Sequence, residues 1–511
     1  MRSTRSRILA AMAAIVVVTT GLAGCGSGDD SGNGAGGDDK HAQLTLGMTA
    51  DLTGGWDIID QPAFQNWGID AVYDTLVRCV KGGDIIPGAA ESWEISDDKK
   101  SFTAHLREGA TYSDGSPVDA ESVKASFEVV SESAADRYGD ITFDVPDANT
   151  ITITWPETQP LMEIRACQPF LASSEYLAKP AEDRKTAPVG SGPYTYDAED
   201  STSGSVYKLT KNPDYWNADA YPYQKLELRV LADEAASINA LKTHQIDGTV
   251  ITATTYEEAK SSGLDIISQE SGMTMIHLTD RQGEVIPALG DVRVRQAMNM
   301  VIDKQSVVDN LWNGLATPIW QPFGIGSEAY LPDMADPYPY DVDKAKSLMA
   351  EAGYEDGFEL TIPTMEGQPW MVAVPYITQQ LAELNIAVKQ KALSGPDAIA
   401  NLLSGDYPVP IWGVGGLSSV EDITVHILDT GFWNVMHQPD ETVNKLWEKV
   451  VTGDEQESVE AQQEINQYVV DQAWFVPILS PQNHYAYDGD SVTIDEVTDP
   501  YGGHPRLVDF Q

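Results

Sequence analysis

Cysteine is scarce in this chain of 511 residues, with three copies, and no two of them form a Cys-x-x-Cys pair. The sequence also lacks a Gly-x-Ser-x-Gly nucleophile elbow, a His-Glu-x-x-His zinc motif and a Gly-x-x-x-x-Gly-Lys phosphate loop. Its eight histidines share no metal-ligand spacing. No motif therefore supports an enzyme, a metal site or a cofactor, and we expect none of the three.

Basic residues are also few, with 32 Lys and Arg against 78 Asp and Glu, for a formal net charge of -46. Such a negative field repels nucleic acid and anionic lipid head groups, and it favours solubility. We expect a soluble monomer with no nucleic-acid partner. The charge does not identify a cationic ligand, since scattered surface carboxylates are the commoner cause of an acidic chain.

Long apolar runs are missing too. The run Ile8 to Val18 follows Arg2, Arg5 and Arg7 and is too short to span a bilayer, so residues 1–24 are predicted to be a signal peptide. Leu22-Ala23-Gly24-Cys25 resembles the bacterial lipobox, which implies a lipoprotein whose mature chain begins at Cys25 carrying palmitate; the alternative is an ordinary cysteine after a cleavage site. Residues 25–40, rich in Gly, Ser and Asp, are then a disordered tether on the extracytoplasmic face of the cell membrane.

The other two cysteines, Cys79 and Cys167, lie in an oxidising compartment if the chain is exported. An even pair there favours a disulfide, against the alternative of two separate buried thiols.

Short strands and turns dominate the first part of the mature chain, beginning with an alternating strand at Leu44 to Met48. The next loop carries Trp56, Asp57 and Asn66, which are ligand candidates that could equally be loop anchors. Helices are predicted where an aspartate precedes apolar residues at helical spacing. These N-caps are Asp119, Asp291 and Asp303, and an amphipathic segment is predicted from Asp341 to Ala352.

A βαβαβ run is predicted from Phe358 to Trp412, and it implies a largely parallel sheet whose carboxyl strand ends face a ligand. Its last strand leads into the loop that contains Gly413, Gly415 and Gly416. Glycine leaves backbone amides uncovered beside the flat indole of Trp412. We predict that this loop binds the ligand, although a buried strand with a tight turn is the plainer interpretation.

The order and wording of several segments resemble the family 5 extracellular solute-binding proteins, the peptide-, nickel- and oligosaccharide-binding subunits of bacterial ABC importers. The segments are "IPGAAESWE", "FTAHLREGATYSDGSPVDAESVKASFE", "VGSGPYTYD", "LTKNPDYW", "INALKTHQIDG" and "DVRVRQAMNMVIDKQSVVDNLWNGLATP". The resemblance covers most of the mature chain. It implies an α/β periplasmic-binding-protein-like fold of the enlarged type II kind, with two lobes joined by a hinge.

On this basis we expect lobe I to comprise residues 41–272 and 475–511, with an inserted subdomain at about 83–190, and lobe II to comprise residues 273–474. The chain would cross between the lobes near Glu270 to His277 and near Ala473 to Pro481. Closure about this hinge would trap the ligand and present a shape that the permease recognises. Further ligand candidates are His277, Trp320 and Trp433.

One departure from the family concerns the ligand. In the peptide-binding members an aspartate follows the tryptophan of this loop and holds the free amino group of the ligand. Here no acid appears until Glu421 and Asp422. Either Glu421 or Asp422 is the anchor, or the ligand carries no amine there and is a blocked peptide, a saccharide or another neutral solute.

We therefore expect a substrate-binding lipoprotein that delivers an oligopeptide-like solute to the permease of an ABC importer. The alternatives are the same fold with an oligosaccharide or neutral solute, and a surface sensor or adhesion module without transport.

Overall fold

The computed structural model describes residues 42–52, 55–59, 67–81, 83–134, 138–365, 367–395, 397–416, 418–500 and 503–511. The predicted Cys25, the tether and Asn66 lie outside these residues.

A ten-stranded mixed sheet runs through the fold in the order β10-β11-β12-β1-β13-β20-β15-β19, with β14 and β16 also paired to β20. The strand predicted at Leu44 to Met48 is β1, and it pairs in parallel with β12 and β13. The bounds are β1 (Gln43–Met48), β10 (Tyr194–Tyr196), β11 (Val206–Lys211), β12 (Lys225–Val230), β13 (Gly248–Ile251), β14 (Asp265–Glu270), β15 (Met273–His277), β16 (Ala316–Pro318), β19 (Ile411–Val414) and β20 (Phe475–Tyr487).

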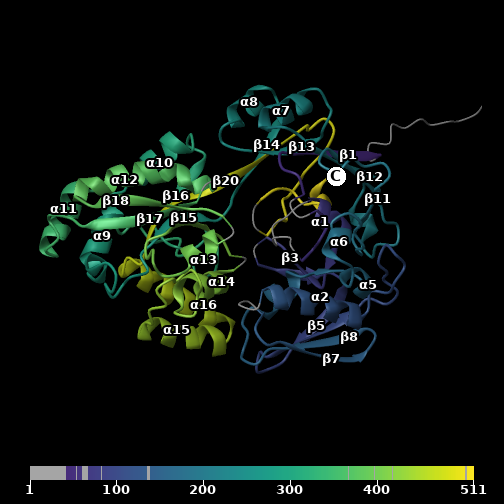
Figure 1. Ribbon diagram of the computed structural model, residues 1–511, viewed down its shortest axis with the longest axis horizontal. Helices are drawn as coiled ribbons and strands as arrows, with labels where there is room; N and C mark the ends of the chain where they lie inside the picture. Colours follow the sequence, from purple (N-terminus) through teal and green to yellow (C-terminus); the bar gives the residue numbers. More distant parts are fainter. Residues whose placement is uncertain are drawn as a thin grey trace, which may run out of the picture. The chain divides into compact units, whose positions relative to one another are not determined.

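The strand β20 is shared by two groups of strands (Figure 1). Its first half, up to Pro481, pairs with β15 and β16, and its second half, from Gln482, pairs with β14 and β13. The chain passes from β14 to β15 through Ser271 and Gly272. Two segments, 271–272 and 480–482, therefore lead from one group of strands to the other.

Residues 83–190 contain a four-stranded antiparallel sheet, β5-β6-β8-β7, covered by α2. As predicted, Asp119 caps α2, and it accepts a hydrogen bond from Ser122 N in a capping box. The apolar face of α2, with Val123 and Phe127, is fully buried. The bounds are β5 (Ala90–Ile95), β6 (Ser101–Leu106), α2 (Ala120–Ser133), β7 (Thr142–Asp147) and β8 (Thr150–Thr154).

Short elements precede and follow this sheet in the chain, and two of them, α7 and α8, pack against β13 and β14 of the large sheet. Four small strands form two antiparallel pairs, β2-β9 and β3-β4. The bounds are α1 (Trp67–Val72), β2 (Asp74–Thr75), β3 (Val77–Cys79), β4 (Ile85–Pro87), α4 (Met162–Cys167), β9 (Phe170–Leu171), α5 (Ser174–Leu177), α6 (Ala181–Arg184), α7 (Glu234–Lys242) and α8 (Tyr256–Ser261).

The predicted parallel βαβαβ sheet is wrong in its last strand. Strands β17 (Glu359–Met365) and β18 (Ala387–Leu393) pair in parallel, with α12 (Val374–Leu381) between them, but they form a sheet of their own. Strand β19, which follows α13 (Ala398–Leu402), pairs antiparallel with β15 instead. β15 lies more than a hundred residues before β19, so this pairing depends on tertiary contacts, which the local periodicity of the sequence does not predict.

The remaining helices are α9 (Val292–Met300), α10 (Lys304–Leu311), α11 (Val342–Glu351), α14 (Ser419–Asp422), α15 (Glu441–Thr452) and α16 (Glu455–Asp471). The predicted caps Asp291 and Asp303 accept hydrogen bonds from Arg293 N and Ser306 N. Asp341, where the predicted amphipathic segment begins, also acts as a cap and accepts a hydrogen bond from Lys344 N. Aspartate suits this position because its side chain satisfies an amide that has no partner inside the helix.

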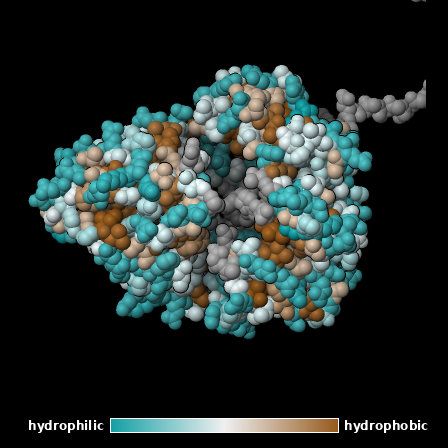
Figure 2. Space-filling view, in the orientation of Figure 1, coloured by the Kyte–Doolittle hydropathy of each residue, from teal (hydrophilic) through white to brown (hydrophobic). Residues whose placement is uncertain are grey.

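Buried apolar residues gather in separate clusters. Two large clusters use residues between 273 and 479, whereas three others draw on residues before 270 and after 484. Among the described residues, none of these five clusters has buried members from both sets. Figure 2 shows hydrophilic residues over much of the visible face, with apolar residues in smaller groups.

Candidate functional site

Strand β19 places Trp412 at the edge of the large sheet. Trp412 is opposite Met275 of β15, and Gly413 is opposite Thr274. The neighbours of Trp412 in the chain, Ile411 and Gly413, point to the other face because side chains alternate along a strand. The indole of Trp412 is half-buried, so part of its surface stays accessible.

Three indoles meet at this edge. The ring of Trp412 lies 4.3 Å from that of Trp433 and 5.0 Å from that of Trp370, measured between centroids. A β-carbon on Gly413 would lie 2.6 Å from two ring carbons of Trp370, so the absence of a side chain there lets the Trp370 ring rest against the strand. Trp370 Nε1 is buried and has no hydrogen-bond partner among the described residues.

Two imidazoles extend this aromatic group. The rings of His277 and His426 are 5.4 Å apart, and His426 lies nearly parallel to Trp433 at 6.4 Å. Burial lowers the pKa of His277 to about 3. The pKa of His426 is well below its usual value because of burial and then of the neighbouring His277. Both rings are therefore neutral at pH 7, and within the described residues neither His277 nitrogen has a partner.

The glycine loop after β19 is fixed by side chains that follow it. Gly416 N donates to Asp422 Oδ1 at 3.0 Å, and Ser418 Oγ accepts from Glu421 N at 3.2 Å to cap α14. Gly415 lies against Gly272 of the segment between β14 and β15. The loop is thus held from two sides while Gly415 stays exposed.

Both acids that follow the loop are engaged. Glu421 Oε1 lies 3.3 Å from Arg165 Nη1, in an ion pair whose side chains are 15% and 9% exposed. Burial, aided by the charges of Glu421 and Glu328, raises the pKa of Asp422 to about 8, although the Gly416 amide opposes that rise. Asp422 therefore holds its proton at pH 7, so it presents no full negative charge to a ligand.

The other predicted ligand residues make contacts of their own. Trp56 is 2% exposed and its ring lies 4.6 Å from Tyr196. Asp57 is fully buried and accepts from Arg184 Nε at 3.0 Å. Trp320 Nε1 donates to Met334 O at 2.7 Å. Of the predicted ligand residues, Trp412 contacts Trp433, His277 joins them through His426, and Gly416 bonds to Asp422. Glu421 pairs with Arg165, whereas Trp56, Asp57 and Trp320 contact other residues.

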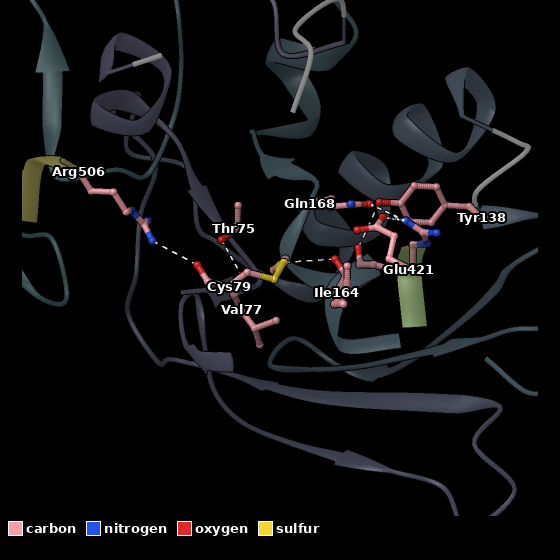
Figure 3. The surroundings of a disulfide bond; sticks show 10 residues. Thr75, Val77, Cys79, Tyr138, Ile164, Gln168, Glu421 and Arg506 are labelled. Atoms are coloured by element: carbon pink, nitrogen blue, oxygen red, sulfur yellow. Dashed lines mark hydrogen bonds and ion pairs between the residues drawn. A yellow bond between two sulfur atoms is a disulfide. The ribbon is translucent and has the colours of Figure 1, made fainter. Parts of the chain in front are cut away.

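A disulfide joins Cys79 of β3 to Cys167 at the end of α4 (Figure 3), with their Cα atoms 5.7 Å apart. Two residues before Cys167 is Arg165, and the backbone oxygen of Arg165 accepts from Tyr138 Oη at 3.1 Å. The disulfide and this hydrogen bond fix the helix that presents the guanidinium to Glu421.

Sequence reasoning missed Trp370, His426 and Arg165 as members of this region. Trp370 comes directly after a Gly-Gln-Pro turn at the carboxyl end of β17, which is a signal that could have indicated a loop position. His426 lies on a π-helical turn, Ile423–Ile427, and such turns are frequent at functional sites. No local pattern predicts that Arg165 meets Glu421, 256 residues away.

Within the described part of the chain, no three His, Cys, Asp or Glu side chains form a group that could hold a metal ion. The helices of that part are too short or too polar to span a membrane.

The family model for bacterial extracellular solute-binding proteins, family 5 Middle, matches residues 84–432. Heme-binding protein A of Haemophilus influenzae is 29% identical over 320 residues, which are 56% of this chain and 57% of that protein. Glutathione-binding protein GsiB of Salmonella paratyphi A is 27% identical over 332 residues, which are 61% of this chain and 62% of that protein. The chain thus spans less than two thirds of the length of these relatives.

Solved structures share the fold at lower identity. The substrate-binding protein CtaP of Listeria monocytogenes has a TM-score of 0.74 at 22% identity and covers 92% of this chain and 99% of its own. The peptide-binding protein AppA of Clostridium difficile has a TM-score of 0.77 at 19% identity and covers 92% and 100%. These likenesses confirm the expected periplasmic-binding-protein fold.

Proposed function

The chain belongs to the bacterial extracellular solute-binding proteins of family 5, and we propose that it delivers an oligopeptide-like solute to an ABC permease. Proteins of this family are extracytoplasmic, and they bind small-molecule or peptide ligands rather than transform them. We propose further that the bound solute carries no free amino group at the β19 loop.

The aromatic group at the end of β19 is the observation that supports this proposal most. Trp412 and Trp433 offer two adjoining indole surfaces, tilted by 36° to each other, and the Trp370 indole N–H has no partner among the described residues. Flat apolar faces with a few polar atoms suit the side chains and peptide groups of an oligopeptide. The backbone amides of Gly413 and Gly415 are proposed to contact the solute backbone, together with the carbonyl of Gly416, whose N–H is taken by Asp422. His277 is neutral.

The state of the two acids supports the absence of an ammonium group. Glu421 is paired with Arg165, and Asp422 is protonated and bonded to Gly416 N. An ammonium group brought here would displace Arg165 or remain without a full counter-charge, and both outcomes cost free energy in a desolvated site. The same observation favours an oligosaccharide or another neutral solute as the second candidate.

We propose a hinged arrangement of two lobes, with lobe I at residues 41–272 and 475–511 and lobe II at residues 273–474. The large apolar clusters separate along nearly the same segments and support this division, although residues 475–479, at the start of β20, are buried with the residues of lobe II. The connections at 271–272 and within β20 are where closure would bend the chain. We also propose that Cys25 carries lipid and anchors the protein to the membrane surface.

Binding by a panel of solutes tests the proposed ligand class. The panel pairs free oligopeptides with N-acetylated peptides of the same sequences, and adds neutral oligosaccharides. At about a hundred times its Kd, a true ligand raises the free energy of unfolding by about 2.7 kcal/mol, which a thermal shift detects. Acetylated peptides should bind at least as tightly as their free twins. A free peptide that binds far more tightly would contradict the neutral site, and binding of sugars alone would leave the second candidate.

Delivery is tested separately from binding. Purified protein with its ligand should stimulate ATP hydrolysis by an ABC importer from the same organism, reconstituted in lipid vesicles. A protein that binds the solute but stimulates no importer would instead be a surface sensor or adhesion module.

A further inference from the structure

A small apolar cluster joins α14 to the disulfide. Cys79, Leu161 and Ile164 are its buried members, and Val420 of α14 packs against them. Val420 belongs to the proposed lobe II, whereas the three buried residues belong to the proposed lobe I. The helix that follows the glycine loop therefore rests on the segment that the disulfide holds.

The ion pair between Arg165 and Glu421 lies directly beside this apolar contact. Both side chains are largely shielded, at 9% and 15% exposure, so solvent screens their attraction less than at the surface. Arg165 Nη1 also donates to Gln168 Oε1 at 3.2 Å, which orients the guanidinium (Figure 3). Arg165 Nε is buried without a partner among the described residues, so the pair with Glu421 is the main compensation for burying this charge.

A second polar contact joins the same two parts of the chain. Lys99 Nζ, from the turn between β5 and β6, donates to Val451 O near the end of α15 at 3.0 Å. Both α14 and α15 are therefore joined to residues 83–190 by groups of the chain itself.

We infer that the contact of Arg165 and Glu421, supported by Val420 and the Cys79–Cys167 disulfide, is a latch that favours the closed form before a solute binds. The latch rests on the proposed two-lobed function. Its elements lie at the glycine loop, so opening the lobes must break the ion pair and expose Val420. A latch of this kind raises affinity, because less free energy of binding is used for closure.

Small-angle X-ray scattering of the ligand-free, full mature chain tests the latch. Glu421→Gln should enlarge the radius of gyration, because it removes the attraction that opposes opening. We expect a roughly tenfold shift from closed toward open, which corresponds to about 1.4 kcal/mol. Glu441→Gln is the matched control, since it removes the same charge from an ion pair on α15 in which Glu441 is 93% exposed. The control should scatter like the wild type.

A second scattering experiment exchanges the charges of Arg165 and Glu421. Arg165→Glu combined with Glu421→Arg restores the opposite charges and should return the radius toward the wild-type value, whereas Glu421→Arg alone should open the chain further. If Glu421→Gln scatters like Glu441→Gln, the contact is static packing and the latch is overturned. The scattering measurement uses no solute. Evidence against the latch would therefore not contradict the proposed solute class, and failure of the panel to identify a ligand would not contradict the latch.

Discussion

Gly272 and Gly415 pack backbone to backbone, so that a β-carbon on Gly415 would lie 2.9 Å from Gly272 Cα. Gly272 belongs to the connection between β14 and β15, and Gly415 belongs to the glycine loop after β19. Ser480 Oγ donates to Gly272 O at 2.8 Å, which adds β20 to the same contact. The proposed hinge and the proposed ligand loop therefore touch directly.

Gly272→Ala should lower the free energy of unfolding for two reasons, the positive φ of this residue and a steric clash of the new methyl group. Gly272 has φ +68°, which costs a residue with a side chain about 1 to 2 kcal/mol, and the new methyl group would also meet Val414 O. Gly109→Ala is the control, because Gly109 has φ +77° and a β-carbon there would meet no atom of the described residues within 4 Å. Urea unfolding should show the larger loss for Gly272→Ala. Equal decreases in the free energy of unfolding would show that the backbone near Val414 shifts to accommodate the methyl group at little cost.

Trp412→Ala should weaken binding of the tightest solute in the panel by about 2 kcal/mol, or about thirtyfold, because a central aromatic anchor is lost. Trp412→Phe retains a flat ring and should lose less. Trp447→Ala removes an indole from α15 that packs outside the aromatic group, and it should leave affinity unchanged. Titration calorimetry gives all three values. Wild-type affinity in a folded Trp412→Ala protein would show that this ring only packs.

Asp422→Asn should raise the free energy of unfolding relative to the wild type, and the difference should grow as pH rises. Burial raises the folded pKa of Asp422 from 3.8 to about 8, so between those values the folded chain binds one more proton than the unfolded chain. The free energy of unfolding then falls with rising pH by up to about 1.4 kcal/mol per unit from this group. The asparagine side chain of the variant does not ionise, so the free energy of unfolding of the variant has no such dependence on pH at this position. Urea unfolding from about pH 5 to about pH 8 measures the difference.

The control for this prediction is Asp343→Asn, on the exposed surface of α11, which removes the same charge. The difference between the Asp343 variant and the wild type should stay nearly constant over the same pH range. A constant difference for Asp422→Asn as well would mean that its carboxyl ionises normally.

Replacing both Cys79 and Cys167 by serine should destabilise the chain by about 4 kcal/mol. The bridge closes a loop with a sequence separation of 88 residues, which restricts the unfolded chain strongly. Wild-type protein unfolded in the presence of a reductant should show the same midpoint as the double variant. If the variant instead matches the oxidised wild type, the disulfide adds no stability.

Local features were predictable from the sequence. Asp119, Asp291 and Asp303 cap the helices that the sequence indicated, because a cap depends on residues within one turn. The family, and with it the fold, was predictable from segments in the right order.

Long-range features were not predictable. Strand β19 pairs with β15, whereas the order of elements had suggested a parallel neighbour. Arg165 pairs with Glu421, and the Gly416 amide bonds to Asp422. These contacts depend on which segments meet in the fold, and they decide whether a carboxylate near Trp412 is free to bind a ligand amine. The tryptophan itself could be found in the sequence, but its partner rings Trp370 and Trp433 lie 42 residues before it and 21 residues after it.

The position of β20 has a consequence for biosynthesis. This strand lies between β13 and β15 in the sheet, yet in the chain it comes after β13, β14, β15 and β16. Until residues 475–487 are made, β14 and β16 lack their partner strand, and β13 and β15 each lack one of their two neighbours. A nascent chain therefore cannot complete its central sheet until β20 has been made.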